Sequence, residues 1–509
     1  MRIERTKNTL RNIVFGFGYR IMNIILPFIS RTAILYILGE QYLGLSSLFT
    51  SILSFLSLAE LGVGGAMVYS MYKPIAENDT VTIRALLNLY RKFYRVIGTV
   101  ILGIGLCLVP FLKLLVREEL PGDVNLYILY FIYLLNAVLS YWLFAYKSAL
   151  LQAYQRNDID SKIAMIIVPL SYVVMLGELF LTGNYYAYII WLPIFTIITN
   201  IVRLIYVNKI FPGLEPQGEI GSELRTSIIK KVKALIGTKL NTVVVNAADN
   251  IVMAAYFGLT TIAMYGNYYY IMSSIIGFLG ICYSAMTAGL GNSIALESEE
   301  KNYNDFMKFS FINSWIVGWC TICLVCLYQP FMYLWAGEDL MFPFYIVLEF
   351  GLYFYIYQIR KIPVTYKDAA GIWWEDRFRP YVCMVVNLVL NIVLAKIIGV
   401  SGILLSTIFS LMISIPWENY TIFKYVFHRS SGEYYRKMAR YAFTVLIAGL
   451  ITFALCCPWK NGFPSLIFRG CICLSVPNLL IVLGNFKAKE FKDAKEFLFS
   501  ILKRKGRAQ

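Results

Sequence analysis

Two arginines interrupt the first long apolar stretch of the sequence, residues 13–39. Arg20 and Arg31 are eleven positions apart, so a helix places both guanidinium groups on nearly the same face. The stretch is long enough to cross a bilayer, which takes about 20 helical residues. A charge at membrane depth costs about 2.5–3.5 kcal/mol on insertion scales, and such side chains usually face a water-filled cavity. The pattern therefore predicts a cationic stripe that lines a path for negatively charged cargo. The alternative is that Arg20 extends to the cytoplasmic headgroups and Arg31 forms a structural ion pair.

A later apolar stretch, residues 238–257, repeats part of this pattern. Arg20 lies nineteen residues before Gly39, and Lys239 lies nineteen residues before Gly258. Such a match at the scale of several helices indicates an internal repeat. It makes Lys239 a third candidate, with Arg20 and Arg31, for binding an anionic substrate.

Two acidic residues are candidates for gating or ion coupling. Arg31 lies eight residues before Gly39 and Asp249 nine residues before Gly258, which places both at depths of roughly 10–14 Å below the outer helix ends. We expect them to face each other as an ion pair that closes the outward gate until an anionic head group competes for the arginine. Glu60 lies roughly 21 Å in from the same side. It is a second candidate, and Arg20 is its expected partner.

Composition defines the class of protein. The chain has 509 residues, of which 59% are hydrophobic and 15% charged, and its mean hydropathy is +0.63. These values are typical of a polytopic membrane protein. The net charge of +16 resides mainly in alternate loops, as the positive-inside rule requires, so nucleic acid is not an expected partner.

Several catalytic and metal chemistries are not expected. The single histidine, His428, excludes multi-histidine metal sites, and the absence of Gly-Lys-Ser and Gly-Lys-Thr excludes a P-loop. Among ten cysteines, Cys320, Cys323 and Cys326 recur at every third position. We interpret them as a stripe of small apolar residues on a membrane helix. We therefore expect a transporter with no metal and no cofactor.

The hydropathy pattern predicts an all-α polytopic fold of about 14 transmembrane helices, with both termini cytoplasmic. It divides the chain into an N-lobe of six spans (1–207), a cytoplasmic connector (208–236), a C-lobe of six spans (237–425), and a region with two further spans and a basic tail (426–509). The repeat predicts two pseudo-symmetric six-helix lobes around a central cavity. The expected spans are 13–38, 46–72, 94–116, 125–149, 163–182, 186–207, 238–257, 264–290, 306–328, 342–366, 381–398, 403–423, 441–457 and 465–484.

The sequence predicts two basic amphipathic helices, Leu224–Leu235 and Glu490–Lys505. In each, apolar residues at helical spacing form one face, and basic residues lie around it. In the second, Phe491 belongs to the apolar face. Such helices lie on an anionic cytoplasmic leaflet. Anionic membrane lipids are therefore expected partners.

Two motifs stand out in the sequence. The N-terminal motif comprises Arg31–Thr32, Leu38–Leu45, Leu56–Gly62 and Tyr72–Asp79, and the second motif is Tyr366–Pro380. Both resemble motifs of Wzx-type flippases, which export polysaccharide units and belong to the multidrug/oligosaccharidyl-lipid/polysaccharide exporter superfamily. The likeness is specific at the two motifs and generic along the rest of the chain.

The resemblance implies a protein of the bacterial plasma membrane that moves an oligosaccharide on polyprenyl pyrophosphate from the inner to the outer leaflet. Its product would feed a cell-surface polysaccharide such as O-antigen or capsule, with other polysaccharide-assembly proteins as partners. Guanidinium groups bind phosphate oxygens bidentately, and ammonium groups bind them as point charges. The candidate cationic contacts are therefore Arg20, Arg31 and Lys239. Arg360 and Lys361 are secondary candidates, because extension to the cytoplasmic surface explains them equally well. Proton and sodium coupling both stay open.

Three alternatives remain. A cation or drug antiporter of the same superfamily would need acidic residues in its cavity. A peptidoglycan-precursor flippase carries a pyrophosphate as well, so the sequence separates it poorly. A membrane enzyme would need a larger outer loop than residues 329–341.

The charged residues of the second motif either lock their loop or contact substrate.

Overall fold

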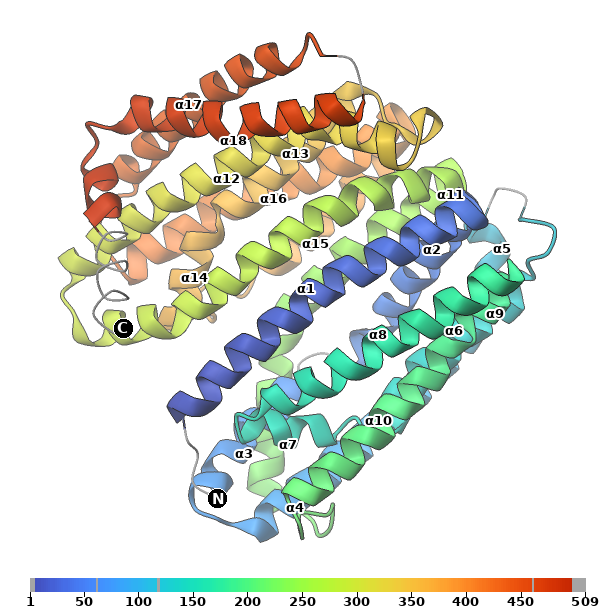
Figure 1. Ribbon diagram of the computed structural model, residues 1–509. Helices are drawn as coiled ribbons and strands as arrows, with labels where there is room; N and C mark the ends of the chain where they lie inside the picture. The colour runs from blue at the N-terminus through green and yellow to red at the C-terminus, as the bar shows by residue number, and fades with distance from the viewer. Residues whose placement is uncertain (1–4, 61–62, 117–119, 460–461, 497–509) are drawn as a thin grey trace. The chain divides into compact units, whose positions relative to one another are not determined.

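The computed structural model describes residues 5–60, 63–116, 120–459 and 462–496, and every regular element within them is a helix (Figure 1). Contacts within the chain divide it into two units, residues 1–263 and 264–509. The all-α expectation is confirmed. The expected lobes and central cavity stay predictions.

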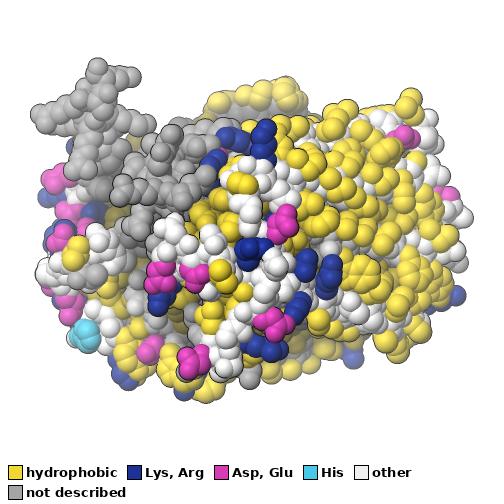
Figure 2. Space-filling model, turned by 90° about the horizontal axis from the view of Figure 1, so that it is seen from below, with side chains coloured by type: hydrophobic (Ala, Val, Ile, Leu, Met, Phe, Trp, Pro, Cys, Tyr) yellow, Lys and Arg dark blue, Asp and Glu magenta, His cyan; other side chains and the backbone are white. Residues whose placement is uncertain are grey.

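Ten of the described helices are long and apolar enough to cross a membrane. An eleventh span is added when α6 (Leu126–Trp142) and α7 (Lys147–Ala153), bent by 54° at their junction, are taken together. The sequence predicts about fourteen. One continuous apolar run, residues 243–294, takes in most of two expected spans. Two other expected spans, 46–72 and 342–366, are divided among helices that are each shorter than 18 residues. Figure 2 shows apolar side chains over broad areas of one face, as lipid contact requires. The protein is a multi-pass membrane protein.

The first unit is built from paired helices. Helix α1 packs on α8, α4 packs on α6, and α10 packs on both α6 and α8. The bounds are α1 Arg5–Ile37, α2 Glu40–Leu56, η1 Ser57–Glu60, α3 Val63–Ala76, α4 Thr80–Leu108, η2 Val109–Phe111, α5 Leu112–Leu115, α8 Asn157–Thr182, α9 Tyr185–Ile189, α10 Trp191–Ile210 and α11 Ser222–Leu296.

The two glycines that close the repeated stretches adopt the same unusual backbone conformation. Gly39, between α1 and α2, has φ 106° and ψ 175°, and Gly258, inside α11, has φ 85° and ψ 179°. Side chains other than hydrogen are strained at such φ values. A shared conformation at these two places supports the repeat that the sequence predicts.

The first part of α11 belongs to the first unit because it packs on α2. Gly44 of α2 lies against the backbone of Leu259, and the Asn250 side-chain amide donates to Ser51 Oγ at 2.8 Å. The division between the units falls after residue 263, and the expected lobe boundary before residue 237 stays a prediction.

The connector after α10 is fastened to one face of α4. Arg84, Asn88 and Lys92, each one turn apart, contact it in order. Arg84 Nε donates to the carbonyl of Glu215 at 3.3 Å, Asn88 donates to the carbonyl of Gly218 at 2.8 Å, and Lys92 pairs with Glu219 at 3.0 Å. These contacts set where α11 begins.

In the second unit, α12 packs against α13, α17 and α18, while α16 packs against α13 and α15. Aromatic residues fill one core of this unit, with Phe306, Tyr366 and Phe427 buried together. The bounds are α12 Glu299–Trp335, η3 Glu338–Leu340, α13 Phe344–Ile359, α14 Lys361–Ala370, α15 Arg379–Ile398, α16 Val400–Tyr425, α17 Gly432–Cys456 and α18 Phe463–Asn485.

The structure packs the start of the second amphipathic stretch, Glu490–Lys505, against other helices, whereas the sequence predicts a position on the membrane surface. The ring of Phe491 stacks on Trp315 of α12, with centroids 6.1 Å apart, and Glu490 is buried and paired with Lys437. The expectation that Phe491 faces lipid headgroups is wrong, because tertiary packing buries the start of this apolar face. Residues 497–505 of the stretch lie outside the described residues.

Candidate functional site

Helix α1 holds Arg20 and Arg31 away from its most exposed apolar stripe. Ile21, Ile25 and Ile29 form that stripe, at 39%, 50% and 45% exposure. The arginines lie at other angular positions on the unbroken helix and are half-buried. Because eleven residues separate them, the helix places them on one side about 16 Å apart, as the sequence predicts. Arg20 Nε is buried without a hydrogen-bond partner in the structure.

Glu60 lies among tyrosines in the short η1 segment. Its carboxylate accepts hydrogen bonds from Tyr94 at 2.6 Å and from Tyr141 at 2.9 Å. Tyr90 in turn donates to the Tyr94 hydroxyl at 2.6 Å. The expected Arg20–Glu60 pair is therefore wrong: within the described residues, phenol groups supply the recorded contacts of this carboxylate. Two phenol donors thus satisfy one hydrogen bond at each carboxylate oxygen.

The structure leaves the other candidates of the first unit as predictions. Asp249 is buried at 5% exposure in α11, and both Asp249 and Arg31 take part in polar or electrostatic interactions. Lys239 lies on α11, and its side chain is outside the described part of the chain. The Arg31–Asp249 gate pair is neither confirmed nor contradicted.

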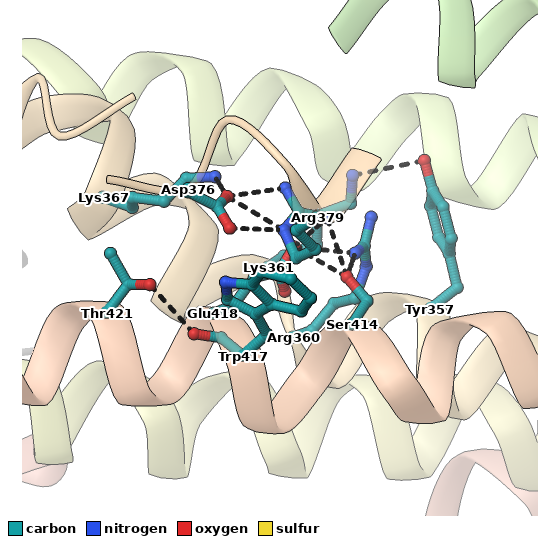
Figure 3. A network of polar contacts seen from close by, with 10 residues as sticks. All are labelled: Tyr357, Arg360, Lys361, Lys367, Asp376, Arg379, Ser414, Trp417, Glu418 and Thr421. Carbon is teal, nitrogen blue, oxygen red and sulfur yellow. Dashed lines mark hydrogen bonds and ion pairs between the residues drawn. The ribbon is translucent and has the colours of Figure 1, made fainter. Parts of the chain in front are cut away.

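A charged cluster in the second unit contains the secondary candidates Arg360 and Lys361 (Figure 3). Its centre is the Glu418 carboxylate, which is 1% exposed. Glu418 Oε1 lies 2.9 Å from Arg360 Nη1 and 3.0 Å from Arg379 Nη1. Ser414 Oγ accepts from both guanidinium groups, at 3.0 and 2.8 Å, and donates to Glu418 at 3.1 Å.

Asp376 extends this network toward the loop of the second motif. Arg379 Nε donates to its two carboxylate oxygens at 2.8 and 2.9 Å, and Lys367 pairs with it from α14. Both Asp376 and Lys367 are buried. Removing one partner from a buried ion pair is strongly destabilising, so these three residues lock the loop. Of the two roles that the sequence left open for the motif, this geometry supports the lock for Lys367, Asp376 and Arg379.

Local structure explains how these residues meet. Helix α14 ends at Gly371, whose φ of 71° is the left-handed conformation that terminates helices. Pro380 in the first turn of α15 then starts the next helix. The turn between them brings Asp376 back onto Arg379. Ser414 and Glu418 are one turn apart on α16, so they present their oxygens together.

The cluster carries more positive than negative charge. Arg360, Lys361, Lys367 and Arg379 supply four cations, whereas the cluster holds two carboxylates, Asp376 and Glu418. Ion pairing thus leaves a formal surplus of two positive charges when all groups are ionised.

That surplus is concentrated at the junction of α13 and α14. Lys361 Nζ contacts Tyr357, at 3.2 Å from the hydroxyl and 4.3 Å from the ring centroid, and no carboxylate partner of Lys361 is recorded among the described residues. Arg360 shares Glu418 with Arg379, and its own Nε is buried without a partner. Tyr357, Arg360 and Lys361 are half-buried rather than sealed. Arg360 and Lys361 form the cationic rim of the cluster.

The sequence predicts Arg360 and Lys361 as secondary candidates for the phosphate contact, after Arg20 and Arg31. It gave Glu418 no defined role, because Glu418 lies 42 residues after Asp376 in an apolar segment. The one available signal was Glu418 itself, a carboxylate within an expected span, since such groups are usually paired.

An apolar groove of about 510 Å³ runs along α12, α13 and α17 in the same unit. Its walls include Val325, Leu348, Leu352, Leu446 and Phe453. The volume falls within the range of ligand pockets, and the lining suits a hydrocarbon chain.

The arrangement of helices can be compared with solved structures. The lipid II flippase MurJ, in an inward closed conformation, matches 93% of this chain and 98% of its own, with a TM-score of 0.67 and 14% identity. The chain shares its fold with a lipid flippase. A multidrug resistance MATE family transporter of the MOP superfamily, in an inward-facing conformation, matches 80% of this chain and 98% of its own, with a TM-score of 0.57 and 12% identity.

The Vibrio cholerae MATE transporter VcmN matches 83% of this chain and 99% of its own, with a TM-score of 0.54 and 14% identity. The all-α fold that the sequence predicts is thus shared with solved transporters of 12–14% identity. No protein-family model matches the sequence, and no curated protein sequence matches it.

Proposed function

We propose that the chain is a flippase that translocates a polyprenyl-pyrophosphate-linked oligosaccharide across the bacterial plasma membrane by alternating access. The carrying observation is the cationic rim, where Arg360 and Lys361 leave positive charge uncompensated among apolar helices. A charge kept at such a place usually serves a substrate path. Pyrophosphate is the matching anion, because guanidinium and ammonium groups donate charge-assisted hydrogen bonds to its oxygens.

The first unit contributes a second set of cations to this proposal. Arg20 and Arg31 lie on one side of α1, and Arg20 Nε is buried without a partner. Lys239 belongs to the same set by its place in the repeat. Glu60 and Asp249 are the proposed gating or coupling residues, with protons or sodium ions as the driving species.

The apolar groove of the second unit supports a lipid-linked cargo. A polyprenyl chain is a long hydrocarbon, and burying such a chain is favourable by about 25 cal/mol per Å². A groove with almost wholly apolar walls therefore offers the tail a surface, while the cations bind the head group. Export of O-antigen or capsule units, cytoplasmic termini and contacts with other assembly proteins and anionic lipids are parts of the same proposal.

Two alternatives from the same fold need discrimination. A cation or drug antiporter requires negative charge at the site, and the surplus in the cluster is positive. A peptidoglycan-precursor flippase is the stronger second candidate, because the match to MurJ has a higher TM-score than the matches to MATE transporters, 0.67 against 0.57 and 0.54. Its substrate also carries a pyrophosphate, so charge does not separate the two.

The test is leaflet-resolved flipping in proteoliposomes, with the full chain and a fluorescent polyprenyl-pyrophosphate oligosaccharide. Replacing both Arg360 and Lys361 with Ala should reduce the flipping rate by about 10–100-fold, the equivalent of about 1.5–3 kcal/mol for a hydrogen bond to a charged group. The matched control is Arg377→Ala, because Arg377 lies in the same loop region, is exposed, and contacts Trp374 outside the cluster. Equal rates in the double variant and the control would overturn the proposal.

Cargo choice is measured in the same vesicles. Lipid II, the oligosaccharide-linked substrate and a cationic dye are offered separately. Preferential flipping of lipid II would favour the peptidoglycan-precursor reading. Movement of the dye alone, driven by an ion gradient, would favour the drug antiporter.

A further inference from the structure

Three cysteine thiols from three different helices converge in the second unit. Cys326 belongs to α12, Cys456 is the last residue of α17, and Cys473 belongs to α18. Their sulfur atoms all lie within 4.8 Å of one another. All three side chains are buried, at 4%, 2% and 1% exposure. The three residues are called the thiol triad below.

The geometry fits a single ion. At a metal–sulfur distance of about 2.3 Å, three sulfurs placed evenly around one ion stand about 4 Å apart, within the observed limit. Thiolate ligands select soft ions, Cu(I) among them. Structural zinc takes four ligands, whereas the group found among the described residues has three. Three converging thiols therefore match a monovalent copper ion better than zinc.

The surroundings of the triad include one buried cation that the proposed transport function does not use. Apolar residues pack around it, with Ile322, Val445 and Ala448 in the same core. Three thiolates in such a place carry a large energetic cost unless opposite charge lies nearby. Arg469 lies one turn before Cys473 on α18 and is 9% exposed. Residues four apart share one face of a helix, so Arg469 lies on the same side of α18 as Cys473.

Arg469 is also incompletely satisfied. One terminal nitrogen donates to the carbonyl of Trp459, while Nε is buried without a hydrogen-bond partner in the structure. A guanidinium with a buried, unpaired nitrogen beside the triad can offset the negative charge that metal-bound thiolates would bring to this apolar core. The cation and the thiol geometry are separate observations that indicate the same chemistry.

We propose that the thiol triad binds one thiophilic monovalent metal ion, Cu(I), and that the bound ion holds α17 and α18 against α12. This revises the expectation of no metal site. Of the stripe Cys320, Cys323 and Cys326 that the sequence shows, only Cys326 joins the triad, and the other two ligands come from helices more than a hundred residues later. The proposal does not depend on the identity of the transported substrate.

Copper binding by the full chain is the direct test. The reduced protein in detergent is titrated anaerobically with Cu(I) in competition with a chromophoric Cu(I) chelator. One ion per chain is expected to bind. Each of Cys326→Ser, Cys456→Ser and Cys473→Ser should weaken binding at least tenfold.

The chain offers matched controls on the same helices. Cys457 follows Cys456 directly, and Cys471 lies two residues before Cys473, yet both are exposed and outside the triad. Cys457→Ser and Cys471→Ser should bind one ion with unchanged affinity. Copper should also raise the melting temperature of the wild-type protein and of these controls, because an ion that binds only the folded state stabilises it.

Two further measurements keep the test decisive if a triad variant fails to fold. Arg469→Gln retains all three thiols and should bind Cu(I) more weakly. X-ray absorption of the copper-loaded wild type should show a first shell of sulfur only. Binding that survives loss of any triad thiol, binding abolished in the two controls, tighter binding of Zn²⁺ than of Cu(I), or a disulfide within the triad of the isolated protein would each overturn the proposal.

Discussion

Arg379 at the start of α15 pairs with Glu418 of α16 across 3.0 Å, and both side chains are buried. The same guanidinium group binds Asp376 three residues earlier. One arginine thus connects the loop of the second motif to the interior of the second unit. Arg360 reaches the same glutamate from the other side, so the structural lock and the cationic rim share one carboxylate.

The lock should be essential for stability. Arg379→Ala leaves the Asp376 and Glu418 carboxylates buried with fewer cations, and breaking a buried pair in this way costs about 3–5 kcal/mol. We expect a clear fall in the melting temperature of the purified protein. Arg377→Ala, two residues away and exposed, should leave it unchanged. Similar melting temperatures for both variants would show that the Arg379 contacts contribute little.

Glu60 should matter for how an ion gradient drives transport. Its carboxylate accepts hydrogen bonds from Tyr94 and Tyr141. Glu60→Gln keeps a hydrogen-bonding group of similar size but removes the carboxylate. We expect the flipping rate of this variant to be the same with and without an ion gradient. Glu178→Gln, on α8, is the control for an acidic residue elsewhere in a span. A wild-type response to the gradient in Glu60→Gln would exclude Glu60 from coupling.

The expected gate is tested by a double-mutant cycle. Arg31→Ala, Asp249→Ala and the double variant are compared for flipping rate. Residues that act on each other should show a coupling energy of about 0.5–3 kcal/mol, with the double variant less impaired than the sum of the single losses. Strictly additive losses would show that Arg31 and Asp249 function independently.

Gly44 should not tolerate a side chain. A Cβ added there would collide with the backbone of Leu259 in α11. The α2–α11 contact must then open, at a cost of about 1–3 kcal/mol for overpacking. Gly44→Ala should therefore lower the melting temperature. At Gly177 in α8, an added Cβ meets no atom within 4 Å, so Gly177→Ala should be neutral or stabilising because alanine favours helix.

Asp79 should contribute a pH-dependent increment of stability. It caps the N-terminus of α4, and hydrogen bonds from Thr82 hold the pKa of its carboxyl below the ordinary value. Because the folded-state pKa is the lower one, the increment is present above the ordinary aspartate pKa of about 3.9. It is lost as pH falls through the folded-state value. Asp79→Asn retains a good cap without titrating. Lowering the pH from about 6 to about 3 should therefore reduce the melting temperature of the wild-type protein more than that of this variant. Parallel losses would exclude this contribution.

Features that depend on local pattern could be predicted from the sequence alone. Long apolar runs predicted a helical membrane protein, and the spacing of Arg20 and Arg31 placed both on one side of α1. The match between Gly39 and Gly258 predicted an internal repeat, and the structure adds that both glycines share one backbone conformation. Each follows from helical periodicity or from the conformational freedom of glycine, which a single segment carries.

Contacts between side chains far apart in the sequence became apparent from the packing of the helices. Glu60 contacts tyrosines from α4 and α6 instead of Arg20. Glu418 joins the network that contains Asp376, although 42 residues separate the two in the sequence. Cys326 lies close to two thiols on α17 and α18. Such contacts depend on how helices pack and rotate against each other. Hydropathy and spacing along one chain do not contain that information, because many packings bury the same apolar faces equally well.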